Sequence, residues 1–241
     1  MKHAGPSSVG VGSSVTDQGP PRTSGSAVDR AVAAVRDGIR DGRYIPGQRL
    51  VENDVMAELG VGRNALREAF SRLRSDGFVV VEAHRGASVR RLSRRDVAHL
   101  YDLREALESL AARLAAQGIH TPGHRERLID ATATMRDVAH TDDLASYVDE
   151  NLRFHRVIVG LSGHDRLTEL VDQLHIQTFR VQFRQVLADT SPHMRDRSVV
   201  EHQAVADAIL GGDAARAEEG MRSHLQHMRA DVMRLPDADF A

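Results

Sequence analysis

Three histidines in the second half of the sequence are candidates for metal ligands. His155, His202 and His224 each recur at helical spacing with Val, Leu, Ile or Met, which places them on the apolar faces of three separate predicted helices. Imidazole is the commonest metal ligand in proteins, so three inward histidines can converge on one divalent ion. A single inward histidine is usually a hydrogen-bonded core residue, and periodicity alone leaves both interpretations open for the three.

A buried arginine is predicted in the same part of the chain. Arg104 lies between Leu100 and Leu107 on the inward stripe of a predicted helix. An unpaired guanidinium inside a protein is costly, so Arg104 needs a carboxylate partner. Glu108, one helical turn later, is the internal candidate, and a small carboxylate ligand is the other.

A third set of candidates, Arg63, Asn64 and Arg67, lies on the polar face of a predicted helix. The opposite face carries an apolar stripe, formed by Leu66, Ala69, Phe70 and Leu73. The planar fork of arginine matches the O6 and N7 atoms of guanine, which makes this face suitable for reading DNA. An ordinary helix with solvated arginines would show the same pattern, so the flanking segments decide.

Those flanking segments predict a winged helix-turn-helix. Residues 51–59 form another short apolar stripe, and Gly60 provides a tight turn before the arginine-bearing helix. Gly77 ends that helix, and Val-rich segments at Phe78–Glu82 and Ser88–Arg91 predict two strands around a turn. Two short helices followed by a basic-tipped hairpin are typical of a helix laid into the major groove of DNA.

The rest of the chain predicts helices with short connections. Apolar residues, Leu103 and Ile129 among them, recur at helical spacing in six segments that start near Ser93, Pro122, Thr141, Leu167, Val199 and Asp213. Six such helices imply an antiparallel bundle. The fold class is therefore mainly α: a disordered tail at residues 1–24, a winged helix-turn-helix at 25–92 and an all-α helical domain at 93–235.

Composition separates the two domains and limits the location of the protein. Residues 28–95 hold 14 Arg against 9 acidic residues, whereas residues 96–241 hold 16 Arg against 24, so a basic unit precedes an acidic one. That asymmetry suits a DNA reader joined to a unit that does not contact DNA. The absence of cysteine, of a signal-like hydrophobic core and of any membrane-length apolar run predicts a cytoplasmic protein without membrane partners.

The stretch from Pro46 to Leu92, PGQRLVENDVMAELGVGRNALREAFSRLRSDGFVVVEAHRGASVRRL, resembles the DNA-binding domain of GntR-family transcription regulators. The resemblance implies that Arg63, Asn64 and Arg67 contact bases or phosphates, and that Arg85 and Gly86 enter the minor groove as the tip of the wing. The sequence departs from the family pattern at Asn53, Gly62 and Ala65. These departures affect the expected operator sequence rather than DNA binding itself.

The second domain resembles the FCD domain (FadR C-terminal domain) that accompanies such a DNA reader. Metal-binding members carry Asp-x-x-x-His on one helix and two later histidines 22 residues apart, and His155, His202 and His224 match with the same final spacing. Asn151 occupies the Asp position, where its amide oxygen can ligate an ion but brings no charge. The resemblance also implies that Arg104 binds a small carboxylate effector beside one divalent ion, which the residues do not identify as Zn, Ni or Mn.

These features predict a metabolite-responsive transcription regulator of the FadR type. We expect a homodimer that represses a catabolic operon and whose affinity for an inverted-repeat operator changes when the carboxylate binds. A metal-dependent enzyme using the three histidines is the alternative, with the winged unit as an accessory binding module. The sequence offers no carboxylate near the histidines as a convincing general base, so we expect no enzyme. A structural DNA binder is a third possibility that leaves the inward polar residues unexplained.

Overall fold

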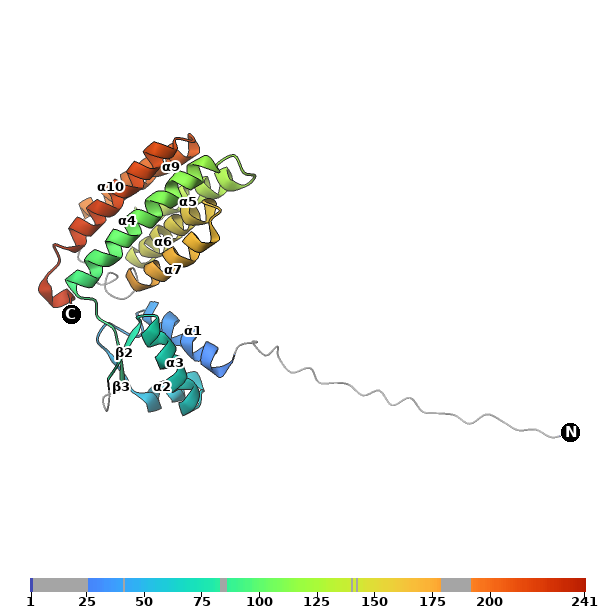
Figure 1. Cartoon of the computed structure of the whole chain (residues 1–241), viewed down its shortest axis with the longest axis vertical. Helices are drawn as coiled ribbons and strands as arrows, with labels where there is room; N and C mark the ends of the chain where they lie inside the picture. Colours follow the sequence, from blue (N-terminus) through green and yellow to red (C-terminus); the bar gives the residue numbers. More distant parts are fainter. Residues whose placement is uncertain (2–25, 41, 83–85, 140, 142, 179–191) are drawn as a thin grey trace.

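The computed structural model describes residues 1, 26–40, 42–82, 86–139, 141, 143–178 and 192–241. It contains a small winged unit followed by a bundle of long helices (Figure 1). The elements are α1 (Ala27–Arg40), β1 (Arg49–Leu50), α2 (Glu52–Leu59), α3 (Arg63–Ser75), β2 (Val79–Glu82), β3 (Gly86–Val89), α4 (Arg94–Gln117), α5 (His124–Ala139), α6 (Leu144–Leu161), α7 (Asp165–Thr178), α9 (Pro192–Leu210), α10 (Ala214–Val232) and the short 3₁₀ helix η1 (Asp237–Asp239). The tail expected at residues 1–24 falls, apart from Met1, outside the described residues.

The winged unit has its own apolar core. Helix α3 packs on α1 with its predicted stripe inward, and Leu66, Ala69 and Leu73 have no exposed surface. Between α2 and α3, Gly60 adopts φ 61° and ψ 37°, a left-handed conformation that glycine adopts without steric strain. The turn between the two helices is therefore the one that the sequence predicted.

The sheet differs in detail from the prediction. Its three strands lie in the order β1-β3-β2, and β1 is a short element that the sequence analysis did not identify. Strand β3 begins at Gly86 rather than Ser88, because Gly86 pairs with Glu82 at the end of the hairpin where β2 connects to β3. At the other end the Arg90 N–H still bonds the Phe78 carbonyl, so the ladder extends slightly beyond the assigned strand.

The bundle is built around α4. This helix packs most extensively on α10, and α5 packs on α6 (Figure 1). Ser93 and Asp96 form a reciprocal capping box at the start of α4, close to where the sequence predicted that a helix begins. Two residues assigned to inward stripes were placed wrongly, since Leu103 is 52 % exposed and Ile129 is 49 % exposed. Each lies at the edge of an apolar stripe that is wider than the face covered by neighbouring helices.

Three helix starts also differ from the prediction. Helix α5 does not begin at Thr121-Pro122 but at His124, directly after Gly123, whose φ is 82°. Helix α6 is capped by Asp143, whose carboxylate accepts the Ser146 N–H. Helix α9 begins at Pro192 rather than near Val199, because proline fits the first helical turn, where its missing N–H is not needed.

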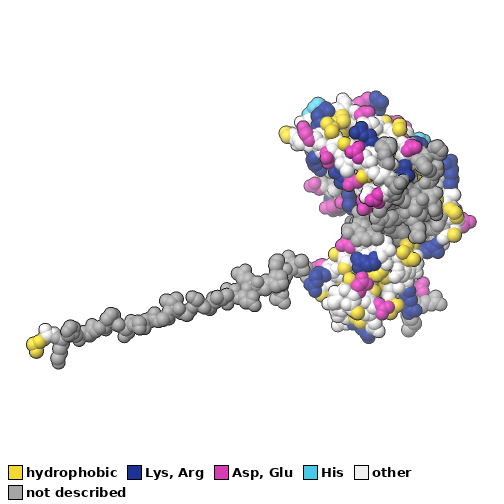
Figure 2. Space-filling model, turned by 180° about the vertical axis from the view of Figure 1, so that it is seen from behind, with side chains coloured by type: hydrophobic (Ala, Val, Ile, Leu, Met, Phe, Trp, Pro, Cys, Tyr) yellow, Lys and Arg dark blue, Asp and Glu magenta, His cyan; other side chains and the backbone are white. Residues whose placement is uncertain are grey.

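The outer surface of the bundle is mixed in charge. On the face drawn in Figure 2, acidic and basic side chains are interspersed over the helical unit rather than gathered into one patch. Among the described residues, no helix is both long enough and apolar enough to cross a membrane.

Candidate metal centre and nucleic-acid interface

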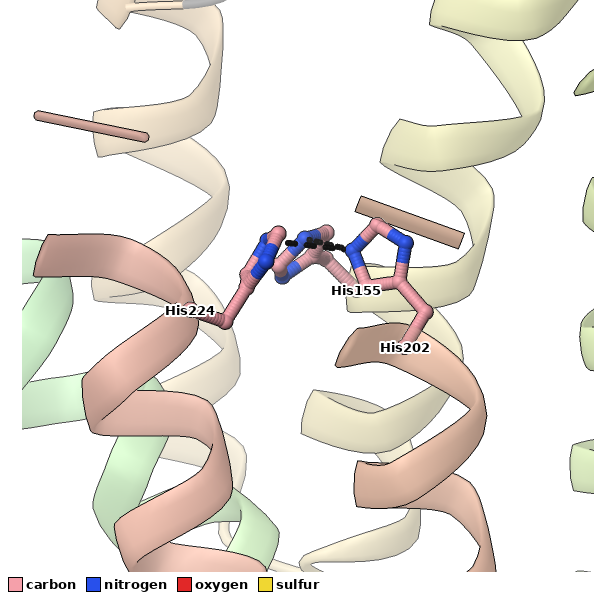
Figure 3. Close-up of side chains that lie close together, drawn as sticks. All are labelled: His155, His202 and His224. Atoms are coloured by element: carbon pink, nitrogen blue, oxygen red, sulfur yellow. Dashed lines mark hydrogen bonds between the residues drawn. The ribbon is translucent and has the colours of Figure 1, made fainter. Parts of the chain in front are cut away.

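Three helices bring His155, His202 and His224 to one point inside the bundle (Figure 3). Nε2 of His202 lies 3.2 Å from Nε2 of His155 and 3.0 Å from Nε2 of His224. The side chains come from α6, α9 and α10, and none is more than 1 % exposed. The structure therefore brings together the three histidines that the sequence singled out.

Apolar packing on one side holds these rings in place. Phe154 is fully buried, and its ring centroid lies 4.7 Å from that of His202 and 5.9 Å from that of His155. Ile158 and Val205, from the helices that carry His155 and His202, belong to the same buried cluster. Because a close-packed core permits few rotamers, the ring positions are fixed by the fold.

The outer nitrogens of two of the histidines contact carboxylates. Glu108 Oε2 lies 2.6 Å from Nδ1 of His155, and Glu201 Oε2 lies 2.8 Å from Nδ1 of His224. A carboxylate on the far side of a ligating imidazole is the usual way in which proteins fix its tautomer and raise its basicity. The sequence analysis found no convincing general base near the histidines, and it did not predict these two contacts, because each joins residues of two different helices.

The number of N–H groups on the three imidazole rings favours a cation between them. A neutral imidazole has one N–H, and the carboxylates accept it from Nδ1 of His155 and of His224. Both Nε2 atoms then present lone pairs toward His202 Nε2, which can donate to only one of them. A divalent ion would accept all three lone pairs, so the residues present fit a metal.

The electrostatics keep these rings neutral, which is the form that binds metal. Burial lowers the pKa of His224 to about 4 and the pKa of His155 below its usual value. Burial, followed by the neighbouring His224 and His155, lowers the pKa of His202 well below its usual range. A ligand that is already deprotonated at neutral pH binds an ion without releasing a proton.

Asn151 lies one helical turn before His155 on α6 and is 3 % exposed. Its Oδ1 is buried, and it has no hydrogen-bond partner among the described residues. A buried carbonyl oxygen without a partner is uncommon in native proteins and often indicates an absent water or ion. Oδ1 of Asn151 is therefore a candidate for an additional metal ligand.

Arg104 is buried, as predicted, and its partner is internal. Its Nε donates to Glu108 Oε1 at 2.7 Å, which is the Glu108 pairing that the sequence offered as one of two alternatives. His175 on α7 also contacts Glu108, with Nε2 3.0 Å from Oε1. Sequence reasoning missed His175, although its position four residues after the buried Val171 was a usable signal.

The face of α3 predicted to read DNA is exposed. Arg63 and Arg67 are 59 % and 63 % exposed in their side chains, and Asn64 is exposed beside them. Gly62 caps the helix through its backbone conformation alone, without a side-chain bond. Arg85 lies outside the described residues, and Gly86 begins β3 with a φ of 83°.

An open groove of about 740 Å³ runs between α3 and the sheet. Its lining includes four arginines and Gly86, namely Arg49, Arg63, Arg67, Arg74 and Gly86. Glu52 also lines it and accepts from Arg67 Nε at 3.1 Å, with Arg63 Nε 3.8 Å away. A groove with this excess of positive charge suits a phosphate backbone.

Comparisons with known proteins agree with both parts of the chain. The model of the family "Bacterial regulatory proteins, gntR family" matches residues 27–89, and the FCD domain model matches residues 99–227, more than half of the chain. A protein of Paenarthrobacter nicotinovorans, described as a probable D-xylose utilization operon transcriptional repressor, is 28% identical over 78% of this chain and 80% of its own. The HTH-type transcriptional regulator LutR of Bacillus subtilis is 28% identical over 81% and 95%. A solved structure from Rhodococcus sp. RHA1, described as a transcriptional regulator GntR, matches with a TM-score of 0.72 at 26% identity, over 86% of this chain and 98% of that one.

Proposed function

The chain belongs to the gntR family of bacterial regulatory proteins and carries an FCD domain, and from that premise we propose how it regulates. It is a homodimeric repressor of a catabolic operon. A small carboxylate bound beside a divalent ion in the bundle changes its affinity for an inverted-repeat operator. The observation that carries the proposal is the convergence of three lone-pair nitrogens, two of them on rings backed by carboxylates, in the domain joined to a DNA reader.

DNA binding is assigned to α3 and the wing. Arg63, Asn64 and Arg67 contact bases or phosphates, while Arg85 and Gly86 contact the minor groove. The groove of about 740 Å³ beside α3 supports this assignment. The ion pairs that Arg67 and Arg63 form with Glu52 lie at the surface and are therefore weak, so DNA phosphates can readily take the place of Glu52.

His155, His202 and His224 would hold one Zn, Ni or Mn ion, with Asn151 as an additional oxygen ligand. Three neutral nitrogens and an oxygen are acceptable to each of these metals. A bound ion supplies positive charge that an effector carboxylate can meet. Arg104 supplies a second positive charge in the same buried region. Burial is the main cause of the lowered pKa of His155, His202 and His224, and the charge of Arg104 lowers these pKa values further.

The interface with the second chain of the homodimer is assigned to the outer face formed by α4 and α7. Leu103 and Leu170 are 52 % and 46 % exposed there, beside the half-buried Leu107, Leu110 and Leu114. An inverted repeat requires two recognition helices related by a two-fold axis, which a self-complementary apolar face provides.

The families and relatives that match this chain are transcription regulators and not enzymes. The buried carboxylate is also unsuited to act as a general base, because Arg104, His155 and His175 occupy both oxygens of Glu108. The enzyme alternative therefore has no support from the geometry.

Gel shifts with the DNA upstream of the neighbouring genes test the proposal. The wild-type protein should retard one fragment, and one member of a panel of hydroxy and keto acids should change its affinity. Arg104→Ala should keep DNA binding and lose that response. A fragment whose retardation responds to a neutral or cationic compound, and to no carboxylate, would contradict the assigned effector class.

A further inference from the structure

The two oxygens of Glu108 serve different groups. Oε2 accepts from Nδ1 of His155 at 2.6 Å, whereas Oε1 lies 2.7 Å from Arg104 Nε and 3.0 Å from His175 Nε2. The four side chains come from α4, α6 and α7, and none is more than 1 % exposed. One carboxylate is thus enclosed by a guanidinium and two imidazoles.

By distance alone, Glu108, His155 and His175 could hold a cation, since one ligand atom from each lies within 4.8 Å of the others. Charge argues against that assignment. The Arg104 guanidinium already occupies Glu108 Oε1, and a second buried cation next to it would be repelled strongly at low dielectric. The reverse description fits the charges, because Arg104 and His155 donate to one anion and His175 Nε2 lies 3.0 Å from it.

We propose that Arg104, His155 and His175 form a carboxylate receptor and that the chain's own Glu108 occupies it. Arginine binds carboxylates through charge-assisted hydrogen bonds, and two imidazole N–H groups complete the shell. The burial of Arg104 requires such an anion, because an unpaired guanidinium would be costly there. Glu108 is thereby the positioning residue for His155, and it links that metal ligand to Arg104.

The receptor deepens the proposed function and in this respect rests on it. An effector carboxylate that takes the Nε donor of Arg104 displaces Glu108 Oε1, while Oε2 keeps its bond to His155. Glu108 then presents its negative charge to His155 without Arg104 to balance it. A more basic imidazole binds a metal ion more tightly, so the effector should raise metal affinity through this one residue.

The other carboxylate of the centre provides a matched control. Glu201 accepts from His224 Nδ1 at 2.8 Å, as Glu108 does from His155. Its second oxygen lies 2.7 Å from His227 Nδ1 and 3.5 Å from Arg197 Nε, but these two side chains are 54 % and 40 % exposed. The Glu201 side chain is 17 % exposed, so water can solvate the groups that its loss leaves behind, whereas Arg104 is only 1 % exposed. Loss of Glu201 should weaken metal binding without creating a receptor for a free carboxylate.

Glu108→Ala tests the receptor in the full-length protein, with sodium acetate as the replacement carboxylate and acetamide as its neutral analogue. The metal-free variant should gain melting temperature saturably with acetate and not with acetamide. Its Zn²⁺ dissociation constant should rise at least tenfold, as is typical when a carboxylate behind a ligating histidine is lost, and acetate should restore it. Glu201→Ala should show the loss of Zn²⁺ affinity but no rescue by acetate.

Several outcomes would overturn the receptor. These are a folded Glu108→Ala protein without saturable acetate stabilisation, equal rescue of Glu201→Ala, or two Zn²⁺ ions per wild-type chain. If Glu108→Ala does not fold, its refolding yield in acetate should exceed that in acetamide, and equal yields would count against the receptor. Glu108→Gln keeps the shape of the side chain, and wild-type Zn²⁺ affinity in this variant would exclude the positioning role. If Glu108→Ala binds acetate but no carboxylate changes the DNA affinity of the wild type, the proposed effector is wrong and the receptor still stands.

Discussion

The guanidinium carbon of Arg94 lies 4.2 Å from the centre of the Phe240 ring. Arg94 also donates to the Met233 carbonyl at 2.7 Å, and the Ala241 N–H bonds the Leu92 carbonyl at 3.0 Å. Leu92 lies in the connection between β3 and α4, and Arg94 is the first residue of α4. The segment after α10 therefore fastens the connection between the DNA-reading unit and the bundle, at the end of the helix that carries His224.

Phe240→Ala should destabilise the protein. Phe240 is 6 % exposed and packs with Leu92, Val97 and Tyr101, so its removal should lower the free energy of unfolding by about 3 kcal/mol. Denaturant titration followed by circular dichroism measures the change. Val200→Ala, at a side chain 68 % exposed, is the control and should change the value by less than about 0.5 kcal/mol.

Arg63→Ala or Arg67→Ala should weaken operator binding by about 1–3 kcal/mol for each lost base contact, and only for operators with the matched base. Fluorescence anisotropy with matched and substituted duplexes measures it. Arg136→Ala, at an exposed position of α5 in the bundle, should bind as the wild type does. Arg85→Ala should weaken binding evenly across sequences. Unchanged affinity and footprint in Arg63→Ala would show that the recognition face was assigned wrongly.

Arg104→Ala should lower the free energy of unfolding by about 3–5 kcal/mol, because it leaves the buried Glu108 without its guanidinium partner. The double variant Arg104→Met, Glu108→Leu removes both charges and should be less destabilised than Arg104→Ala, although it also takes the carboxylate away from His155 and His175. Denaturant titrations of the two proteins give the comparison. Equal stability of Arg104→Ala and the wild type would mean that this pair contributes little to the fold.

The metal-free protein should become less stable as the pH falls from about 6.5 to about 4. In the folded state burial lowers the pKa of His224 to about 4, and the pKa values of His155 and His202 shift in the same direction. Since the unfolded chain binds more protons in that window, stability is full above pH 6.5 and is lost toward pH 4. The His224 shift alone corresponds to about 3 kcal/mol. Chelator-treated protein with equal unfolding free energies at pH 7 and pH 5 would refute this.

Periodicity predicted the elements and the inward histidines because each depends on local spacing. Leu66, Ala69 and Leu73 are buried at the predicted i, i+3 and i+7 positions. The same rule could not predict that Leu103 is exposed. The apolar stripe of this helix is wider than the face that the bundle covers, and the sequence does not mark where the covered part ends. Burial at that edge is decided by which neighbouring helix covers it.

The partners of the histidines could not be predicted in the same way. Glu108 and His155 are 47 residues apart, and their contact depends on the packing of α4 against α6. Glu201 adjoins His202 in sequence but bonds His224 instead, because adjacent helical residues point in different directions. These are tertiary contacts, and the spacing of one helix does not specify them.

Metal analysis of tag-free protein tests the central claim most directly. Elemental analysis should find close to one divalent ion per chain in the wild type and almost none in His202→Ala, whose ring faces both other histidines. Chelated wild type should regain melting temperature with Zn, Ni or Mn, since the ion joins three helices. A wild type that is purified without metal, and whose melting temperature responds to none of the three ions, would contradict the claim and reduce the histidines to core residues.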